Sequence, residues 1–362
     1  MKEITESITP PSEIPNETST KKEKDFTEIP LHVYFLIILA MIMTSFASIL
    51  IRYAGKDAIT IGLEPASASI IAFWRLFFAT IGMFFGALVT RNLQEFKKVN
   101  PRGDLPLLTL SGLALAIHFV TWNLSLEKTN VASSITIVYL MPLFAIGFSF
   151  LFLKEKISWI QFGVILLTIS GAIIVGVSDL QSQGSGSLIG DLFALAGAIS
   201  GAGYFVIGRK KREKLDIFSY TTIVYGICTI FLLIYNLSLR NNFFQNLAWQ
   251  HFLFFFLLAL GPSCLGHTLY NYSLEYIRAP VITVTALGEM FGATLLAFLL
   301  FNELPPWLAF VGMGLVAGGI LATVYLENRA LRKQRNKRRK EQEKNNENKK
   351  TQKNENGAGK GT

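Results

Sequence analysis

The chain has 362 residues, of which 51% are hydrophobic, and its mean hydropathy is +0.40. That is too apolar for a soluble protein, and the apolar residues form continuous blocks of about 20 residues, the length at which a helix crosses ~30 Å of hydrocarbon. Because polar and apolar residues do not alternate within the blocks, the pattern excludes a β-barrel. The net charge of +9 lies mostly in the stretch 327–362, whose thirteen Lys and Arg and five Glu give +8.

The first 30 residues are polar and rich in Pro, Thr and Glu, and we expect them to be disordered. They contain no apolar core before a small-residue cleavage site, so we expect no cleaved signal peptide. Ten apolar stretches follow and predict an all-α integral membrane protein with ten transmembrane helices. These predicted spans cover about 31–52, 67–90, 105–126, 130–153, 158–178, 188–208, 217–239, 251–275, 279–302 and 306–326.

Positive charge in the short loops predicts the orientation of the chain. The loops after the second, fourth, sixth and eighth spans hold twelve Lys and Arg, whereas the loops on the other face hold four. Because Lys and Arg are retained on the cytoplasmic side, we expect a multi-pass plasma-membrane protein with both termini in the cytoplasm.

A shift of 148 residues aligns part of the chain with itself. The segment Trp122–Glu127 falls on Tyr270–Glu275, with the sequences WNLSLE and YNYSLE. The same shift aligns further landmarks: Glu155 with Glu303, Trp159 with Trp307 and Gly171 with Gly319. We therefore predict an N-tail (1–30), a five-helix repeat (31–180), a linker (181–187), a second repeat (188–326) and a basic C-tail (327–362).

Five spans are an odd number, so the second repeat is expected to cross the membrane in the opposite sense to the first. Inverted repeats give two nearly equivalent arrangements, each open to one side, with the solute site near the midplane. This architecture is typical of alternating access. A larger helical bundle without a transport function is the alternative for a duplicated chain.

Two charged residues lie well inside predicted spans. Arg75 is about eight residues into the second span, where an arginine costs on the order of 3 kcal/mol on insertion scales. Glu289 lies near the middle of the ninth span and is a candidate proton carrier. Each residue has a structural alternative: Arg75 could extend to the headgroups, and the two could form a permanent ion pair.

Polar residues recur at helical spacing in the third span and in its repeat mate, the eighth, so each set lies on one helix face. Such residues also join transmembrane helices by hydrogen bonds, but two matched stripes favour a lined cavity, with aromatic walls that carry a polar tip. Besides Arg75, the predicted substrate-binding or cavity residues are His118, Trp122, Asn123, Tyr139, Tyr204, His267, Tyr270 and Asn271.

The sequence shows no motif of enzyme or cofactor chemistry. It has no Gly-rich phosphate-binding loop, and its four histidines and two cysteines have no metal-ligand spacing. We therefore expect neither an enzyme nor a cofactor or metal.

Several short motifs together resemble one family. They are Phe73-Trp74-Arg75, Val131-Ala132-Ser133-Ser134 leading to Leu140-Met141-Pro142, and the segments Leu151–Glu155 and Leu299–Glu303. They are similar to the EamA-type members of the drug/metabolite transporter superfamily from 31 to 326. The resemblance implies secondary transport, commonly metabolite export, and a central cavity lined by spans 1, 3, 4, 6, 8 and 9. The chain departs from the pattern at Glu289-Met290, where the family often has Glu-Pro, which puts proline-dependent gating in doubt.

Our leading hypothesis is a secondary exporter of amino acids or similar small metabolites, with proton coupling through Glu289. An exchanger of nucleotide-sugar or sugar-phosphate type ranks lower because phosphate requires several basic residues, whereas Arg75 is alone. A non-transporting membrane scaffold that uses the basic tail is a third reading. The expected partners are a small-molecule solute and, for the tail, anionic lipid rather than nucleic acid; the sequence leaves a homodimer open.

Overall fold

The computed structural model describes residues 28–55, 57–129, 131–180, 187–244, 246–301 and 304–358, which contain helices and no strand. Their contacts define one unit, Glu28–Gln334, and a second unit formed by the remaining residues. Most of the predicted N-tail, nearly all of the predicted linker and the repeat landmark Glu303 lie outside the described residues.

The helices of the first part are α1 (Leu31–Ala54), the 3₁₀ helix η1 (Ala58–Ile61), α2 (Ala68–Val89), the 3₁₀ helix η2 (Asn92–Lys98), α3 (Leu105–Lys128), α4 (Val131–Val138), α5 (Met141–Phe148), the π-helical segment η3 (Ser149–Leu153) and α6 (Trp159–Leu180). Those of the second part are α7 (Leu188–Arg212), α8 (Ile217–Ser238), α9 (Trp249–Leu258), the π-helical segment η4 (Ala259–His267), α10 (Thr268–Ser273), α11 (Ala279–Ala286), α12 (Glu289–Phe301) and α13 (Trp307–Ala358).

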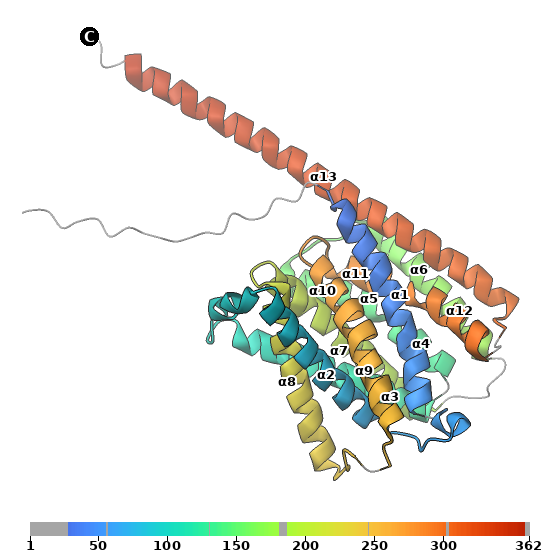
Figure 1. Ribbon diagram of the computed structural model, residues 1–362. Coiled ribbons are helices and arrows are strands. Elements are labelled where there is room, and N and C mark those ends of the chain that lie inside the picture. The colour runs from blue at the N-terminus through green and yellow to red at the C-terminus, as the bar shows by residue number, and fades with distance from the viewer. Residues whose placement is uncertain are drawn as a thin grey trace, which may run out of the picture. The chain divides into compact units, whose positions relative to one another are not determined.

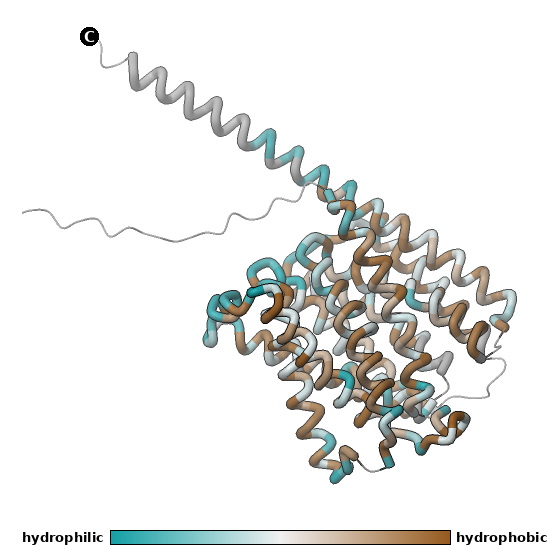
Figure 2. Tube along the Cα trace, viewed as in Figure 1, coloured by the Kyte–Doolittle hydropathy of each residue, from teal (hydrophilic) through white to brown (hydrophobic). Residues whose placement is uncertain are grey.

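The predicted all-α membrane fold is confirmed. In the described residues, nine helical stretches are long and apolar enough to cross a membrane, and α6 adds a shorter apolar stretch, Trp159–Val175. Figure 2 shows the apolar residues along the lengths of these helices and the hydrophilic residues gathered at their ends. The count of ten spans stays a prediction.

Several helices begin where the sequence supplies a starting signal. Pro106, Pro142 and Pro280 each lie in the first turn of a helix, where a missing N–H removes no hydrogen bond. Asp216 caps α8, since its carboxylate accepts hydrogen bonds from the backbone N–H groups of Phe218 and Ser219 at 2.9 and 3.2 Å.

Three predicted spans depart from one regular α-helix. The fourth divides into α4, α5 and η3; the eighth into α9, η4 and α10; and the ninth into α11 and α12. Glu289 lies near the middle of the ninth span, Ala279–Leu300, as predicted, and it is the first residue of α12 after the turn that divides the span. A π-helical segment shifts the hydrogen-bond ladder from i−4 to i−5, and such segments are frequent at functional sites.

The interruption of the ninth span needs no proline. At Leu287 and Gly288 the backbone N–H groups bond to carbonyls three residues earlier, at 3.1 and 2.9 Å. A Cβ at Gly288 would lie 1.9 Å from Cε of Met41, so α1 approaches the chain at the point where the helix breaks. The ninth span therefore breaks without the proline of the family's Glu-Pro pair, at a point where α1 packs closely against it.

The interruptions of the fourth and ninth spans share one register. The segments 131–138 and 141–153 lie 148 residues before 279–286 and 289–301, the shift at which the sequence motifs align. The two last helices of the repeats also contact each other reciprocally: a Cβ at Gly171 would lie 3.1 Å from N of Val316, and a Cβ at Gly319 would lie 2.8 Å from Cβ of Thr168. Under the same shift, each of these contacts maps onto the other.

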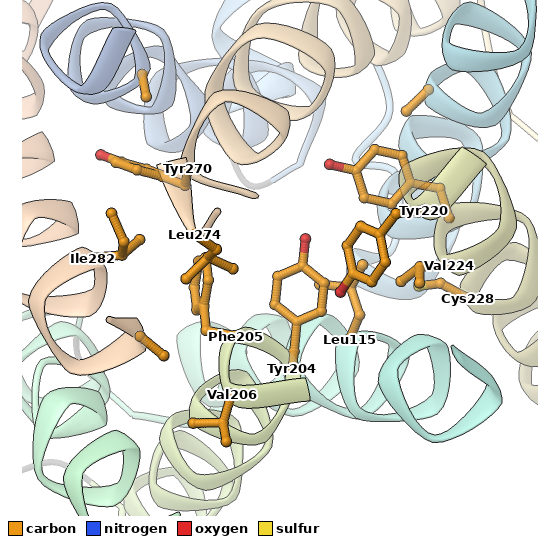
Figure 3. Packing of buried hydrophobic residues seen from close by; sticks show 14 of the residues in the cluster. Leu115, Tyr204, Phe205, Val206, Tyr220, Val224, Cys228, Tyr270, Leu274 and Ile282 are labelled. Atoms are coloured by element: carbon orange, nitrogen blue, oxygen red, sulfur yellow. The ribbon is translucent and has the colours of Figure 1, made fainter. Parts of the chain in front are cut away.

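The core of the unit Glu28–Gln334 lies where helices distant in sequence meet. α3 packs against α7, α2 against α8, α1 against η4 and α10, and α5 against α11 (Figure 1). Figure 3 shows buried side chains of three of these helices meeting: Leu115 of α3, Tyr204 and Phe205 of α7, and Tyr220 and Val224 of α8.

α13 continues beyond the predicted end of the last span at residue 326 and reaches Ala358. From Asn328 to Asn356 the sequence contains no Gly or Pro and is rich in Lys, Arg, Glu and Gln, which favour helix. The predicted boundary between span and tail is thus a change in polarity and not a change in backbone conformation.

Candidate functional site

A cavity of about 620 Å³ lies among α1, α2, α3, α4, α5, α7, η4, α10, α11 and α12. Seven of the ten predicted site residues line it: Arg75, His118, Trp122, Tyr204, His267, Tyr270 and Glu289. A second cavity of about 420 Å³ shares Trp122 and Glu289 with it and adds Tyr139. The lining of the larger cavity also includes residues that the sequence analysis did not select: Thr44, Ala47, Val138, Met141, Gly201, Phe205 and Ala286.

Arg75 projects from α2 and is only 2% exposed. Its Nε donates a hydrogen bond to Oγ of Ser263, in η4, at 2.7 Å. The guanidinium carbon lies 4.6 Å from the ring centroid of Phe119, a cation–π distance. Among the described residues Nη2 has no hydrogen-bond partner. The side chain is therefore fixed on one side and keeps a free donor.

His118 and Trp122 lie one turn apart on α3. Nδ1 of His118 donates a hydrogen bond to the carbonyl of Gly197 at 2.8 Å, because a carbonyl only accepts. The two rings stack with centroids 6.0 Å apart. In the described part of the chain the indole Nε1–H of Trp122, which only donates, has no partner. The contact to α7 fixes the imidazole, which in turn supports the indole that lines the cavity.

His267, the last residue of η4, lies between aromatic rings. Its ring centroid is 5.7 Å from that of Phe119 and 6.4 Å from that of Phe205. Nδ1 makes no hydrogen bond to any described residue. Since the guanidinium of Arg75 lies over the same Phe119 ring, His267 and Arg75 share one aromatic contact.

The structure places Asn123 and Asn271 outside the cavity lining. Nδ2 of Asn123 donates to the carbonyl of Ala68, in α2, at 3.1 Å. Nδ2 of Asn271 donates to Oη of Tyr204 and to the carbonyl of His267. These amides join helices and position the cavity residue Tyr204, the packing role that was the alternative for the polar stripes.

Glu289 lines both cavities from the first position of α12. Its backbone carbonyl accepts a hydrogen bond from Oγ of Ser45, in α1, at 2.8 Å. Both Arg75 and Glu289 are described, and they form no ion pair within 4.0 Å. The permanent ion pair that was the structural alternative is thus not formed, and the two charged side chains line one cavity separately.

Some of the other lining residues have a signal in the sequence. Met141 lies 148 positions before Glu289, so the repeat register relates the two first residues of α5 and α12. Phe119 and Ser263 contact Arg75 without lining the larger cavity. Ser263 belongs to the polar stripe of the eighth span, whereas Phe119 gives no sign in the sequence of contacting an arginine. Among the described residues, no group of three His, Cys, Asp or Glu side chains could hold a metal ion.

One end of the same unit carries charged contacts between the predicted repeats. Nζ of Lys211 lies 2.7 Å from Oδ1 of Asp104, and Nε of Arg209 lies 3.2 Å from Oε1 of Glu155. Burial alone would raise the pKa of the Asp104 carboxyl, but the hydrogen bond from Lys211 and its charge lower it below 3.8. Burial raises the pKa of the Glu155 carboxyl above 4.5, although Arg209 opposes the shift.

Arg278 and Glu327 extend this charged end. Nε of Arg278 donates to both carboxylate oxygens of Glu327 at 2.9 Å, and the Glu327 side chain is 1% exposed. Arg278 also donates to Oε1 of Gln161 at 2.9 Å and to the carbonyl of Lys156 at 2.6 Å. Arg278 therefore links α13 to the loop and helix that follow the fourth span.

Comparison with known proteins gives one family. Residues 31–177 and 188–325 each match the EamA-like transporter family. The chain is 23% identical to "Uncharacterized transporter YdfC" of Bacillus subtilis, with 75% of this chain and 86% of that protein covered. It is also 23% identical to an S-adenosylmethionine uptake transporter of Rickettsia bellii, with 73% and 86% covered.

A probable terminal-alkyne amino-acid exporter of Streptantibioticus cattleyicolor is 23% identical, with 77% of this chain and 90% of that protein covered. One solved crystal structure, 15% identical, has a TM-score of 0.67 over 83% of this chain and 98% of that chain. The relatives agree on transport, and their names differ in solute and direction; the structural likeness concerns the fold alone.

Proposed function

This chain belongs to the EamA-like transporter family, and on that premise we propose that it is a secondary transporter that exports amino acids or similar small metabolites across the plasma membrane. The observation that carries this proposal is the cavity of about 620 Å³. Its lining combines aromatic walls with a few polar groups, as the linings of small-molecule sites do. Buried donors without partners, at Arg75 and Trp122, are costly unless a bound molecule satisfies them.

We propose alternating access as the mechanism. Both predicted repeats line the cavity, the first through α1, α2, α3 and α5 and the second through α7, η4, α10 and α12. The common register of the two interrupted spans and the reciprocal contact between α6 and α13 support two related halves. Movement of one half against the other would then expose the same cavity to either side.

We assign the charged end to the cytoplasmic side because it holds the loops rich in Lys and Arg. There the pairs Asp104–Lys211 and Glu155–Arg209 join a residue of the first predicted repeat to one of the second. In the proposed mechanism these contacts separate when the cavity opens to the cytoplasm and re-form before the solute is released outside.

We propose Glu289 as the group that couples transport to protons. It lines both cavities and, among the described residues, forms no ion pair with Arg75, so it is free to gain or lose a proton as the solute binds. In proteoliposomes, Glu289→Gln should remove the dependence of solute flux on a pH gradient while flux down a solute gradient persists. Unchanged pH dependence would exclude Glu289 from coupling.

The charge of the lining weighs against the exchanger of phosphorylated solutes. The larger cavity is lined by one Arg and one Glu, and phosphate recognition usually gathers several cationic donors. A trans-stimulation assay with sugar phosphates decides the matter, since acceleration by solute inside the vesicles would favour exchange.

The experiment that tests transport itself combines binding and flux. Purified full-length protein is screened by thermal shift against a metabolite library, because a bound solute stabilises by RT ln(1 + [L]/Kd). Each stabilising solute is then loaded into proteoliposomes and its efflux is measured. Stabilisation without efflux for every solute would contradict the proposed function.

A further inference from the structure

We infer that the cavity is a dipolar site, in which Arg75 binds a carboxylate and Glu289 binds an ammonium group of the same solute, so that the protein selects zwitterions of the α-amino-acid type. This inference rests on the proposed transport function and deepens it. It depends on the two opposite charges that line one cavity without touching each other.

The part of the cavity that would bind the carboxylate contains two N–H donors without a hydrogen-bond partner among the described residues. Arg75 is 2% exposed and held by Ser263 and by the ring of Phe119, while its Nη2 stays unpartnered among the described residues. Nε1 of Trp122, which only donates, also has no partner among the described residues. A guanidinium remains charged in proteins, and a buried cation requires an anion or strong acceptors. A carboxylate in the cavity would accept from both donors.

The ammonium end is the carboxyl group of Glu289. The hydroxyl-bearing residues Thr44 and Tyr270 line the same cavity and supply further oxygen atoms. An ammonium group has three donors and no acceptor, so a carboxylate with hydroxyl oxygens around it matches its chemistry. Glu289 and Tyr139 both line the second cavity.

Charge balance separates zwitterions from other solutes. A solute with one negative charge would satisfy Arg75 and leave Glu289 as a buried carboxylate without a partner, and a cationic solute would do the reverse. An uncompensated buried charge is strongly unfavourable. A zwitterion compensates both charges at once, and the apolar residues Met141 and Phe205 remain for its side chain.

Matched solutes test this inference without any mutation. Binding to purified full-length protein is measured for phenylalanine, for phenylalaninamide, which lacks the carboxylate, and for 3-phenylpropionate, which lacks the ammonium group. The same triads are built on alanine and leucine, so that one side chain of unsuitable size does not decide the result. In at least one triad the zwitterion should bind about tenfold or more tightly than both partners, since each lost charge-assisted contact has that effect. No such preference in any triad, including no binding at all, overturns the inference.

Two substitutions test which residue binds the carboxylate and which binds the ammonium group of the solute. In Arg75→Gln the zwitterion and the amide should bind equally, whereas in Glu289→Gln the zwitterion and the deaminated acid should bind equally. A merely structural role would weaken the binding of all three solutes together. Arg75→Lys keeps the charge and should keep part of the preference, which covers the case in which Arg75→Gln does not fold. Arg102→Gln and Glu64→Gln, at exposed positions outside the cavity, are the controls and should change no affinity.

The outcomes distinguish this inference from the proposed function. Efflux of a bound monocation or monoanion, with no zwitterion bound, refutes the dipolar site and leaves transport intact. Selective binding of zwitterions without efflux from proteoliposomes supports the dipolar site and refutes the transport function.

Discussion

The two ends of the unit Glu28–Gln334 join the predicted repeats by different chemistry. At one end the contacts are ionic, as in Asp104–Lys211 at 2.7 Å and Glu155–Arg209 at 3.2 Å. The Lys211 side chain is 6% exposed and that of Asp104 is 15% exposed, so solvent reaches this pair only in part.

At the other end, where α8 ends and α9 begins (Figure 1), the long-range contacts of the described residues include bonds between uncharged groups. The indole Nε1 of Trp74 donates to the carbonyl of Phe243 at 3.1 Å, and Nε2 of His251 donates to the carbonyl of Glu64 at 2.8 Å. The ion pair Arg52–Asp57 joins residues five positions apart and links no two repeats. The two ends therefore differ in the chemistry of the contacts that join the predicted repeats.

The largest effect is expected when one partner of a deeply buried ion pair is removed. Arg278→Ala leaves Glu327, 1% exposed, without the guanidinium that binds both of its oxygens. Breaking such a pair typically costs about 3–5 kcal/mol. Thermal unfolding in detergent should show this as a large fall in Tm.

The control for Arg278→Ala is Lys98→Ala, which removes a pair with Glu95 whose lysine side chain is 58% exposed. Exposed pairs contribute roughly 0–1 kcal/mol, so the Tm should hardly change. Equal losses in the two variants would show that burial does not distinguish the charged end from ordinary surface pairs.

The second effect is a pH dependence of opposite sign at two carboxyls of the charged end. The folded-state pKa of Asp104 is lowered below 3.8, so its stabilising contribution is present above that pH and is lost as pH falls through the lowered value. The folded-state pKa of Glu155 is raised above 4.5, so its contribution is present below 4.5 and is lost as pH rises through the raised value.

Two variants measure these contributions in the full chain. Asp104→Asn should reduce the loss of stability in acid below about pH 4, and Glu155→Gln should reduce the decline of stability as pH rises above 4.5. The readout is the difference in Tm between variant and wild type at each pH. If the Tm difference is independent of pH for both variants, titration of Asp104 and Glu155 does not contribute to the stability of this end.

The sequence predicts the membrane helices well because lipid imposes a physical requirement on the chain. A span must be apolar over its whole length, and this property is readable without a partner. The interruption at Leu287 and Gly288 is not readable in this way. Met41 of α1 packs against Gly288 at the break, and the local sequence lacks the proline that usually marks such a break.

The candidate site was predictable to the extent that charge and helical spacing reveal it. Arg75 and Glu289 stand out because they are charged within apolar spans. Helical spacing also placed Asn123 and Asn271 with the stripes, but their amides bond to a backbone carbonyl and to Tyr204. Which polar residue binds its own protein and which remains free depends on neighbouring helices, and spacing along one helix does not contain that information.

A smaller effect should come from salt. Raising the ionic strength weakens contacts between charges that solvent reaches and leaves neutral hydrogen bonds nearly unchanged. We expect hydrogen–deuterium exchange to become faster by about twofold or more in segments 100–108 and 209–219 between 0.05 and 1 M salt. Segments 64–70 and 241–251, at the neutral end, are the internal control. Equal acceleration at both ends would contradict the ionic difference between them.

The smallest effect concerns the polar part of α13, and the structure decides where the chain should be cut. Asn328 accepts a hydrogen bond from the backbone N–H of Ile29 at 3.1 Å, and Arg332 lies 3.0 Å from Glu28. Removal of 328–362 would therefore break contacts with α1, whereas removal of 335–362 spares the unit Glu28–Gln334. The shorter deletion should leave Tm and solute efflux unchanged, and the longer one should lower Tm modestly. Loss of efflux in the shorter deletion, with Tm unchanged, would instead assign the basic tail a direct part in transport.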